Sequence, residues 1–219
     1  MNVLCIGDIV GRPGRSALID LLDVIKKREA IDFTIVNAEN SAGGSGLTSR
    51  IAKQFNKIGC NVLTLGDHVW DQKELETYLD ETDFVVRPLN FPEGTPGVGY
   101  CIKELDNGVK VGVINLIGRV FMRFNVDCPF LALDKAVEEI RRETPIIFVD
   151  MHAETTSEKV AIGHYATGKV SCLFGTHTHI QTADDKVLDG KTAYITDLGM
   201  TGPYDSVIGQ EKDNIIDGY

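Results

Sequence analysis

Two histidines, His177 and His179, follow a short apolar run, Val170 to Phe174, that Gly175 closes. An apolar run of this length ended by glycine predicts a buried strand, and side chains two apart on extended backbone point the same way. We therefore expect both imidazoles to face one side. Imidazole is the commonest protein metal ligand, and a paired-metal hydrolytic site holds its ions about 3.5–4 Å apart, within reach of two such neighbours. Taken alone, the pair leaves a metal site and a plain polar strand end both open.

Polar side chains recur at the ends of other predicted strands. The apolar runs at 2–7, 33–36, 62–65 and 146–149 are each followed within a few residues by acids, amides or histidines. Any one of these could be an ordinary turn residue. Because ligand sites in open α/β sheets collect beyond the carboxyl ends of strands, the recurrence favours one shared site. Its candidate residues are Asp8, Glu39, Asn40, Asp67, His68, His152, His177 and His179.

The candidate set offers imidazole and oxygen ligands without thiolates, which suits iron, manganese or zinc. It is too large for one ion, whereas two ions that share a bridging carboxylate would use it. Such a pair polarises a phosphoryl oxygen, generates hydroxide near neutral pH and stabilises in-line displacement, so the set predicts phosphoester hydrolysis. The sequence has no H-E-x-x-H motif of a zincin protease, and its hairpins disfavour a barrel amidohydrolase.

The glycines near the start of the chain invite a second interpretation, a nucleotide-binding loop. Gly7, Gly11 and Gly14 fit neither the dinucleotide pattern G-x-G-x-x-G nor the phosphate-loop pattern. Asp8 would also repel a phosphate, and Pro13 lacks the amide hydrogen that such loops donate. We therefore interpret this segment as a carboxylate delivered at a strand end.

The elements that position these residues begin as alternating strands and helices. After the first strand, Leu18, Leu21, Leu22 and Ile25 fall on one face at helical spacing. A second helix is expected over about residues 49–58, between two apolar strands. This alternation predicts an α/β protein.

Later segments depart from this alternation of strands and helices. Asp71 and Glu74 have the spacing of an N-cap and its capping-box glutamate, so a helix should start there. Adjacent apolar runs around residues 106–108 predict a β-hairpin, and hence a second sheet or a mixed sheet edge. Residues 117–130 are expected to be irregular and to border a site. His164 lies on the body of a predicted helix, and we expect no role for it.

The composition is that of a globular protein, with 43% hydrophobic and 25% charged residues in 219. The formal net charge of −10 disfavours binding of nucleic acid through a broad basic surface, but allows a small phosphorylated ligand if metal ions supply positive charge. The five cysteines are widely spaced and are expected to be reduced. Neither a signal peptide nor a membrane-spanning run is recognisable, so we expect a cytoplasmic protein without membrane contact.

Six segments form an ordered pattern over essentially the whole chain: GD at 7–8, NAENSAGG at 37–44, GDHVWD at 66–71, HAE at 152–154, GTHTH at 175–179 and ITDLGMTGPYDSVIG at 195–209. Together they resemble the YmdB-like branch of the calcineurin-like metallophosphoesterases. The resemblance implies one domain over 1–219 with a four-layer α/β fold, in which two mixed β-sheets lie face to face and α-helices flank them. It also implies a two-metal site, with iron or manganese favoured and zinc open, that hydrolyses 2′,3′-cyclic nucleotides or related phosphodiesters.

The resemblance assigns the metal ligands by position. In its pattern, one residue bridges the two ions and three further residues complete each site. The first ion would be held by Asp8, Asn40 and His179, the bridge would be Glu39, and the second ion would be held by Asp67, His152 and His177.

His68 occupies the place of the general acid in this pattern. It would protonate the leaving alkoxide after attack by a metal-bound hydroxide, a role that suits an imidazole titrating near neutral pH. Arg12 and Arg119 are the candidates for contact with the substrate phosphate.

Asp67 departs from the pattern, because the family usually has asparagine there. The added negative charge should tighten metal binding but weaken the ions as Lewis acids and disfavour an incoming phosphate. The alternative function is therefore a metal- or nucleotide-binding regulatory protein with weak or lost turnover. Self-association into a homo-oligomer stays open, and the resemblance implies a short C-terminal tail beyond residue 219.

Overall fold

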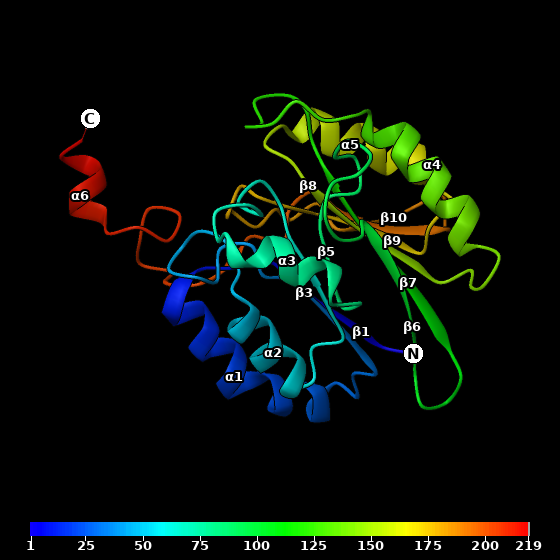
Figure 1. The fold of residues 1–219 in the computed structure, drawn as a ribbon, viewed down its shortest axis with the longest axis horizontal. Helices are drawn as coiled ribbons and strands as arrows, with labels where there is room; N and C mark the ends of the chain where they lie inside the picture. Colours follow the sequence, from blue (N-terminus) through cyan, green and yellow to red (C-terminus); the bar gives the residue numbers. More distant parts are fainter. Residues whose placement is uncertain (219) are drawn as a thin grey trace.

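Two β-sheets form the centre of the molecule, which a computed structural model describes over residues 1–218 (Figure 1). The first sheet consists of β1 (Val3–Ile6), β3 (Phe33–Asn37), β4 (Val62–Thr64) and β5 (Val85–Val86), side by side in that order. All its neighbouring strands run parallel. A helical connection after each strand brings the next strand back in the same direction. The prediction of two mixed sheets is therefore wrong for this sheet, which is purely parallel.

The second sheet is mixed, as predicted. Its strands, in spatial order, are β10 (Lys186–Leu188), β11 (Thr192–Ile195), β9 (Cys172–Thr176), β8 (Ile147–His152), β7 (Lys110–Ile117) and β6 (Tyr100–Glu104). Hairpins supply an antiparallel pair at each edge, and the central strands run parallel. A short parallel ribbon joins β2 (Asp8–Ile9) to β12 (Met200–Thr201), so the late part of the chain returns to its beginning.

Helices cover the outer faces of both sheets (Figure 1). The first sheet carries α1 (Gly11–Arg28), α2 (Ser49–Lys57) and α3 (Glu74–Asp80), and the second carries α4 (Pro129–Ile140) and α5 (Thr156–Ala166). The C-terminal α6 (Lys212–Ile216) stands away from this body and has no buried residue.

The inner faces of the two sheets share an apolar core. Phe33, Ile35 and Val62 of the first sheet cluster with Val113 and Phe174 of the second, and all five side chains are buried. Burial of an aliphatic or aromatic side chain of this size contributes about 1.5–3 kcal/mol. The core therefore fixes the two sheets against each other, and with them the edge at which several strands end.

Two details of the helices differ from the sequence prediction. Leu18 and Leu22 are buried, but Leu21 is 52% exposed, because only a narrow stripe of α1 with a spacing of four residues meets the sheet. Helix α3 begins at Glu74 and has no side-chain cap, so the predicted start at Asp71 is wrong. The Asp71 carboxylate is instead engaged in a tertiary contact near the site.

All five cysteines are free thiols, as predicted, and burial raises the pKa of Cys60 and Cys101 to about 12. Within residues 1–218, no helix is long and apolar enough to cross a bilayer. Of the stretch 117–130 that is predicted to be irregular, residues 118–128 contain neither helix nor strand, while Ile117 ends β7 and residues 129–130 begin α4.

Candidate metal centre

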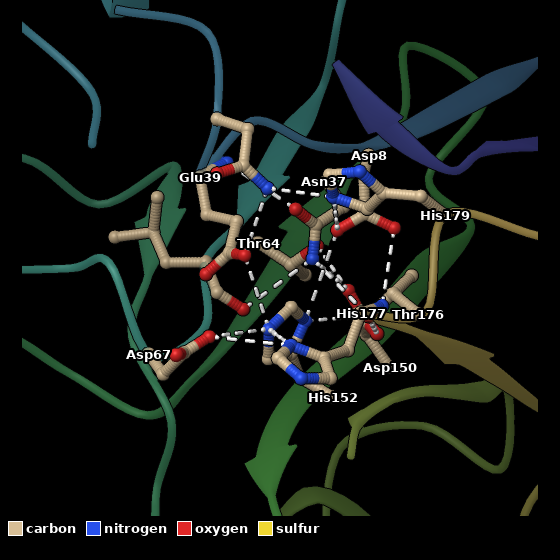
Figure 2. Close-up of polar contacts among 12 residues, drawn as sticks. Asp8, Asn37, Glu39, Thr64, Asp67, Asp150, His152, Thr176, His177 and His179 are labelled. Carbon is tan, nitrogen blue, oxygen red and sulfur yellow. Dashed lines mark hydrogen bonds and ion pairs between the residues drawn. The ribbon is translucent and has the colours of Figure 1, made fainter. Parts of the chain in front are cut away.

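Four side chains from four strand ends converge on one point (Figure 2). Glu39 follows β3, Asp67 follows β4, His152 ends β8 and His177 follows β9. One ligand atom from each lies within 4.8 Å of all the others. His152 Nε2 is 3.1 Å from both Glu39 Oε1 and Asp67 Oδ1, and His177 Nδ1 is 3.3 Å from Asp67 Oδ1. The sequence prediction of a shared site is thus met for these residues.

Asp8, Asn40 and His179 lie beside this cluster. Asn40 Nδ2 donates to Glu39 Oε1 at 2.9 Å and lies 3.1 Å from His179 Nε2. Asp8 Oδ1 is 4.0 Å from His179 Nε2. All seven predicted ligands are therefore neighbours, while their division between two ions stays a prediction.

Three features of the cluster fit a bound cation. Among the described residues, Asp8 Oδ1 is one of three buried side-chain nitrogen or oxygen atoms without a hydrogen-bond partner. His152 Nε2 and His177 Nδ1 lie 3.0 Å apart, an arrangement that two lone pairs tolerate only with a proton or a cation near them. A Cβ on Gly66 would lie 2.2 Å from both Glu39 Oε2 and His152 Nε2, so only glycine allows these ligands to approach.

The pKa shifts in the cluster also fit a bound cation. Burial lowers the pKa of His152, but the charge of Glu39 and the hydrogen bond to Asp67 outweigh it and raise that pKa well above its usual value. Burial raises the pKa of Asp8 to about 7, and the charge of Glu39 adds to the rise, against the opposing effect of His152. Asp67 is held ionised, since hydrogen bonds from His152 and His177 lower its pKa despite burial. Crowded carboxylates thus create a negative potential that a metal ion would neutralise.

The two histidines that carry the sequence prediction do not lie on extended backbone. Strand β9 ends at Thr176, and His177 and His179 have φ angles of 100° and 63°, in the left-handed region. The expectation that strand alternation aligns them is therefore wrong. Tertiary hydrogen bonds position them instead: His177 N donates to Asp8 Oδ2 at 3.1 Å, and His179 Nδ1 donates to the Ile208 carbonyl at 2.9 Å.

His68 lies next to the cluster but has other partners. Its Nδ1 is 2.7 Å from Asp71 Oδ2 and 3.1 Å from Ser45 Oγ, and its backbone N donates to Glu39 Oε2 at 3.2 Å. Arg123, from the irregular stretch, donates to Asp71 Oδ1 at 2.8 Å. A carboxylate on Nδ1 leaves Nε2 for a ligand in the cavity, the arrangement that a general acid requires. The spacing of Asp71 and Glu74 predicts a helix cap, whereas in the structure the Asp71 carboxylate contacts His68.

A buried network beneath the cluster was not predicted. Asp150 accepts hydrogen bonds from Thr176 Oγ1 at 2.7 Å, Thr64 Oγ1 at 2.5 Å and Asn37 Nδ2 at 3.0 Å. Because the Thr176 hydroxyl has one hydrogen and donates it to Asp150, it must accept from His152 Nδ1, 2.9 Å away. With a metal ion bound in place of the proton that Nε2 shares with Asp67, the network would therefore turn the lone pair of His152 Nε2 toward that ion. A charged residue inside the apolar run of β8 was the available signal.

A cavity of about 720 Å³ opens over the centre. Its floor includes Glu39, His68 and His177, and its walls come from the glycine-rich 43–45 loop and residues 208–211. Neither Arg12 nor Arg119 lines it. Arg12 is exposed on α1, and the backbone of Arg119 donates to the Glu158 carboxylate beside a separate hollow. Contact of either arginine with a phosphate stays a prediction.

His164 is exposed on α5 and does not line the cavity, and that it has no role stays a prediction. Glu154 is a residue to which the sequence assigned nothing. Its carboxylate lies 3.2 Å from His177 Nε2 at the wall of the cavity.

Known proteins resemble this chain over nearly its whole length. A 2′,3′-cyclic-nucleotide 2′-phosphodiesterase of Bacillus subtilis is 47% identical over 216 residues, which cover 99% of this chain and 81% of that protein. A putative phosphatase/phosphodiesterase of Mycoplasma genitalium is 38% identical over 216 residues, which cover 95% and 75% respectively.

Two crystal structures share the fold. A hypothetical protein from Thermus thermophilus superposes with a TM-score of 0.91 and 42% identity, covering 99% of this chain and 83% of that one. A novel phosphatase from Mycoplasma pneumoniae gives a TM-score of 0.90 and 35% identity, covering 98% and 77%. Residues 4–219 also match the family described as YmdB-like protein. The predicted membership is confirmed, and the chain belongs to the YmdB-like family.

Proposed function

We propose that this protein is a dinuclear-metal-dependent phosphodiesterase that hydrolyses 2′,3′-cyclic nucleotides or related phosphodiesters. The observation that carries the proposal is the convergence of the seven predicted ligand side chains, four of which line one cavity together with His68. The names of the relatives support the reaction class, since those proteins are described as phosphodiesterases or phosphatases.

The ligand set supports two transition-metal ions, iron or manganese before zinc, because it combines imidazoles with carboxylates and an amide. We propose Asp8, Asn40 and His179 for one ion, Asp67, His152 and His177 for the other, and Glu39 as the bridge. When bound, such ions supply Lewis-acid activation of the phosphoryl group and a nucleophile at neutral pH. The cavity lining contains no lysine or arginine, so the charge of a bound phosphate would be balanced at the centre itself.

His68 supplies the proton in the proposed reaction. Asp71 holds Nδ1, so Nε2 can protonate the leaving oxygen as the bond from phosphorus to the 2′ oxygen breaks. The 2′ oxygen then becomes a hydroxyl, and the phosphate stays on the 3′ oxygen. Asp71 and Arg123 orient the ring without touching the substrate in this scheme.

The layered architecture supports a calcineurin-like sandwich formed by one domain. Both sheets share the core around Phe33 and Phe174, and helices cover both outer faces. We propose that residues 1–219 form this single domain and that it acts in the cytoplasm on small substrates.

A turnover assay distinguishes the enzyme from a regulatory binding protein, because both would bind metal. The purified protein, loaded with Mn²⁺ or Fe²⁺, would be assayed against 2′,3′-cyclic nucleotides and linear phosphodiesters. We expect turnover in the wild type and a loss of about 10²-fold or more in His68→Ala. The control is His164→Ala, at an exposed histidine on α5. Absence of turnover, or turnover that His68→Ala leaves intact, would favour the binding protein.

A further inference from the structure

A strained two-residue hairpin forms part of the cavity wall. Val207 and Gln210 exchange two backbone hydrogen bonds of 2.9 Å each, and the residues between them, Ile208 and Gly209, have φ angles of 45° and 99°. A turn with positive φ at both central residues normally has Asn-Gly or Gly-Gly there. Isoleucine in the left-handed region is an outlier, because its branched Cβ meets the backbone. Such strain persists only where the surroundings enforce it.

Packing and hydrogen bonds hold the hairpin beside the candidate metal centre. A Cβ on Gly209 would lie 2.7 Å from Val10 Cγ1, so the glycine packs directly against that side chain. Ser206 Oγ accepts from Gly209 N at 2.9 Å. The Ile208 carbonyl can only accept, so His179 Nδ1 carries the hydrogen and the Nε2 lone pair faces Asn40. The strained residue is thus coupled to a predicted metal ligand.

The Ile208 side chain is the accessible aliphatic group of the cavity. The lining is otherwise polar or glycine, apart from Val10, which is only 7% exposed whereas Ile208 is 47% exposed. Asparagine would relieve the strain but would put an amide at this place in the wall. Because isoleucine is kept here despite the strain, we infer that an apolar surface at this place beside the centre has a function.

We propose that Ile208 is a specificity-determining residue, which contacts the apolar face of the nucleoside while the phosphate lies at the metal centre. The inference rests on the proposed function and extends it to the substrate class: phosphodiesters that carry a nucleobase, in preference to those without one. The backbone strain of the hairpin is retained because it delivers this side chain and the carbonyl that positions His179 together.

Ile208→Asn tests the proposal, since asparagine favours the left-handed backbone but removes the apolar contact. The substrates are 2′,3′-cyclic AMP and glycerol 1,2-cyclic phosphate, which has no base. We expect the ratio of their kcat/KM values to fall about tenfold in favour of the base-free compound, mainly through KM for the nucleotide. The Tm for thermal unfolding of the metal-free variant should be about 2–4 °C higher than that of the metal-free wild type, because the strain is relieved.

Two further variants complete the design. Ile208→Val keeps a branched apolar side chain and should restore most of the discrimination. Ile216→Asn, at an isoleucine 64% exposed on α6, is the matched control and should change neither the ratio nor the Tm. An unchanged ratio in Ile208→Asn, or a Tm that does not rise, would overturn the inference.

If the proposed function is wrong, the wild type will turn over neither substrate, which distinguishes this outcome from an unchanged ratio. The contact of Ile208 with the nucleoside is then tested by calorimetric titration of 2′,3′-cyclic AMP into the wild type and Ile208→Asn. Weaker binding to the variant would support the contact, and equal or absent binding would overturn it.

Discussion

The Nδ1 atom of His68 lies 2.7 Å from Asp71 Oδ2, while the other oxygen of that carboxylate accepts from Arg123 at 2.8 Å. Burial raises the pKa of Asp71, but hydrogen bonds from Ser45, His68 and Arg123 outweigh it and keep the pKa below its usual value. The carboxylate is therefore ionised at neutral pH and holds the imidazole in one orientation. A residue that resembles a helix cap thus acts as the partner of the proposed general acid.

Replacement of this partner should reduce turnover. Asp71→Asn keeps the size of the side chain but removes its charge, so we expect kcat to fall by about 10–10²-fold with little change in KM. The measurement is steady-state hydrolysis of 2′,3′-cyclic AMP by the metal-loaded protein. Asp23→Asn, at a 72% exposed carboxylate paired with Lys27, is the matched control. Full activity of Asp71→Asn would show that His68 needs no orienting partner.

Asp67 contributes one of the negative charges of the centre. Its Oδ1 lies 3.1 Å from His152 Nε2 and 3.3 Å from His177 Nδ1, at the position for which the sequence resemblance implies asparagine. Asp67→Asn removes one negative charge next to the proposed ions, so we expect a Kd for Mn²⁺ about tenfold higher and a kcat/KM several-fold higher at saturating metal. Calorimetric titration gives the first quantity, and hydrolysis of a linear phosphodiester gives the second. If kcat/KM does not change, the carboxylate does not tune the reaction.

The sequence predicts that the candidate ligands converge, and the structure brings them together, because each of them is marked locally. An acid, amide or histidine directly after an apolar run is visible without any knowledge of tertiary contacts, and Asp8, Glu39, Asp67 and His152 all have this mark. The parallel arrangement of the strands then brings their ends together.

Features set by tertiary contacts were predicted poorly. The Asp71 carboxylate had two possible uses, a helix cap and a partner for His68, and a spacing rule identifies only the first. The left-handed φ angles of His177 and His179 depend on hydrogen bonds to Asp8 and Ile208, far away in the sequence. Asp150 is satisfied by residues of both sheets, which no local pattern reveals.

A buried ion pair supports the loop that carries the two histidines. Lys159 Nζ lies 2.6 Å from Asp197 Oδ2, both side chains are almost fully buried, and the same oxygen accepts from the Thr178 hydroxyl at 2.8 Å. Lys159→Met leaves the carboxylate buried without its cation, so we expect the free energy of unfolding to fall by about 3–5 kcal/mol. Urea unfolding of the metal-free protein measures this. Lys27→Met, at an exposed pair, should have almost no effect, and equal losses in the two variants would contradict the explanation.

The Asp184 carboxylate should make stability depend on pH. Burial raises its pKa, but hydrogen bonds from Thr182 Oγ1 at 2.6 Å, Thr196 Oγ1 at 2.5 Å and Thr196 N at 3.1 Å outweigh it, and the pKa is lowered. A lowered pKa in the folded state stabilises the protein above the unfolded-state value of about 3.9, and this stabilisation is lost as the pH falls through the folded-state pKa.

Asp184→Asn should therefore be less stable than the wild type by about 1 kcal/mol at pH 7, and the difference should shrink below about pH 4. Urea unfolding of the metal-free protein at pH 7, 5 and 3.5 gives the difference directly. Asp185→Asn, at the exposed neighbouring carboxylate, should show no such trend. A difference between wild type and Asp184→Asn that stays constant down to pH 3.5 would mean that shape, rather than charge, makes Asp184 stabilising, because only the charged carboxylate accepts all three hydrogen bonds at full strength.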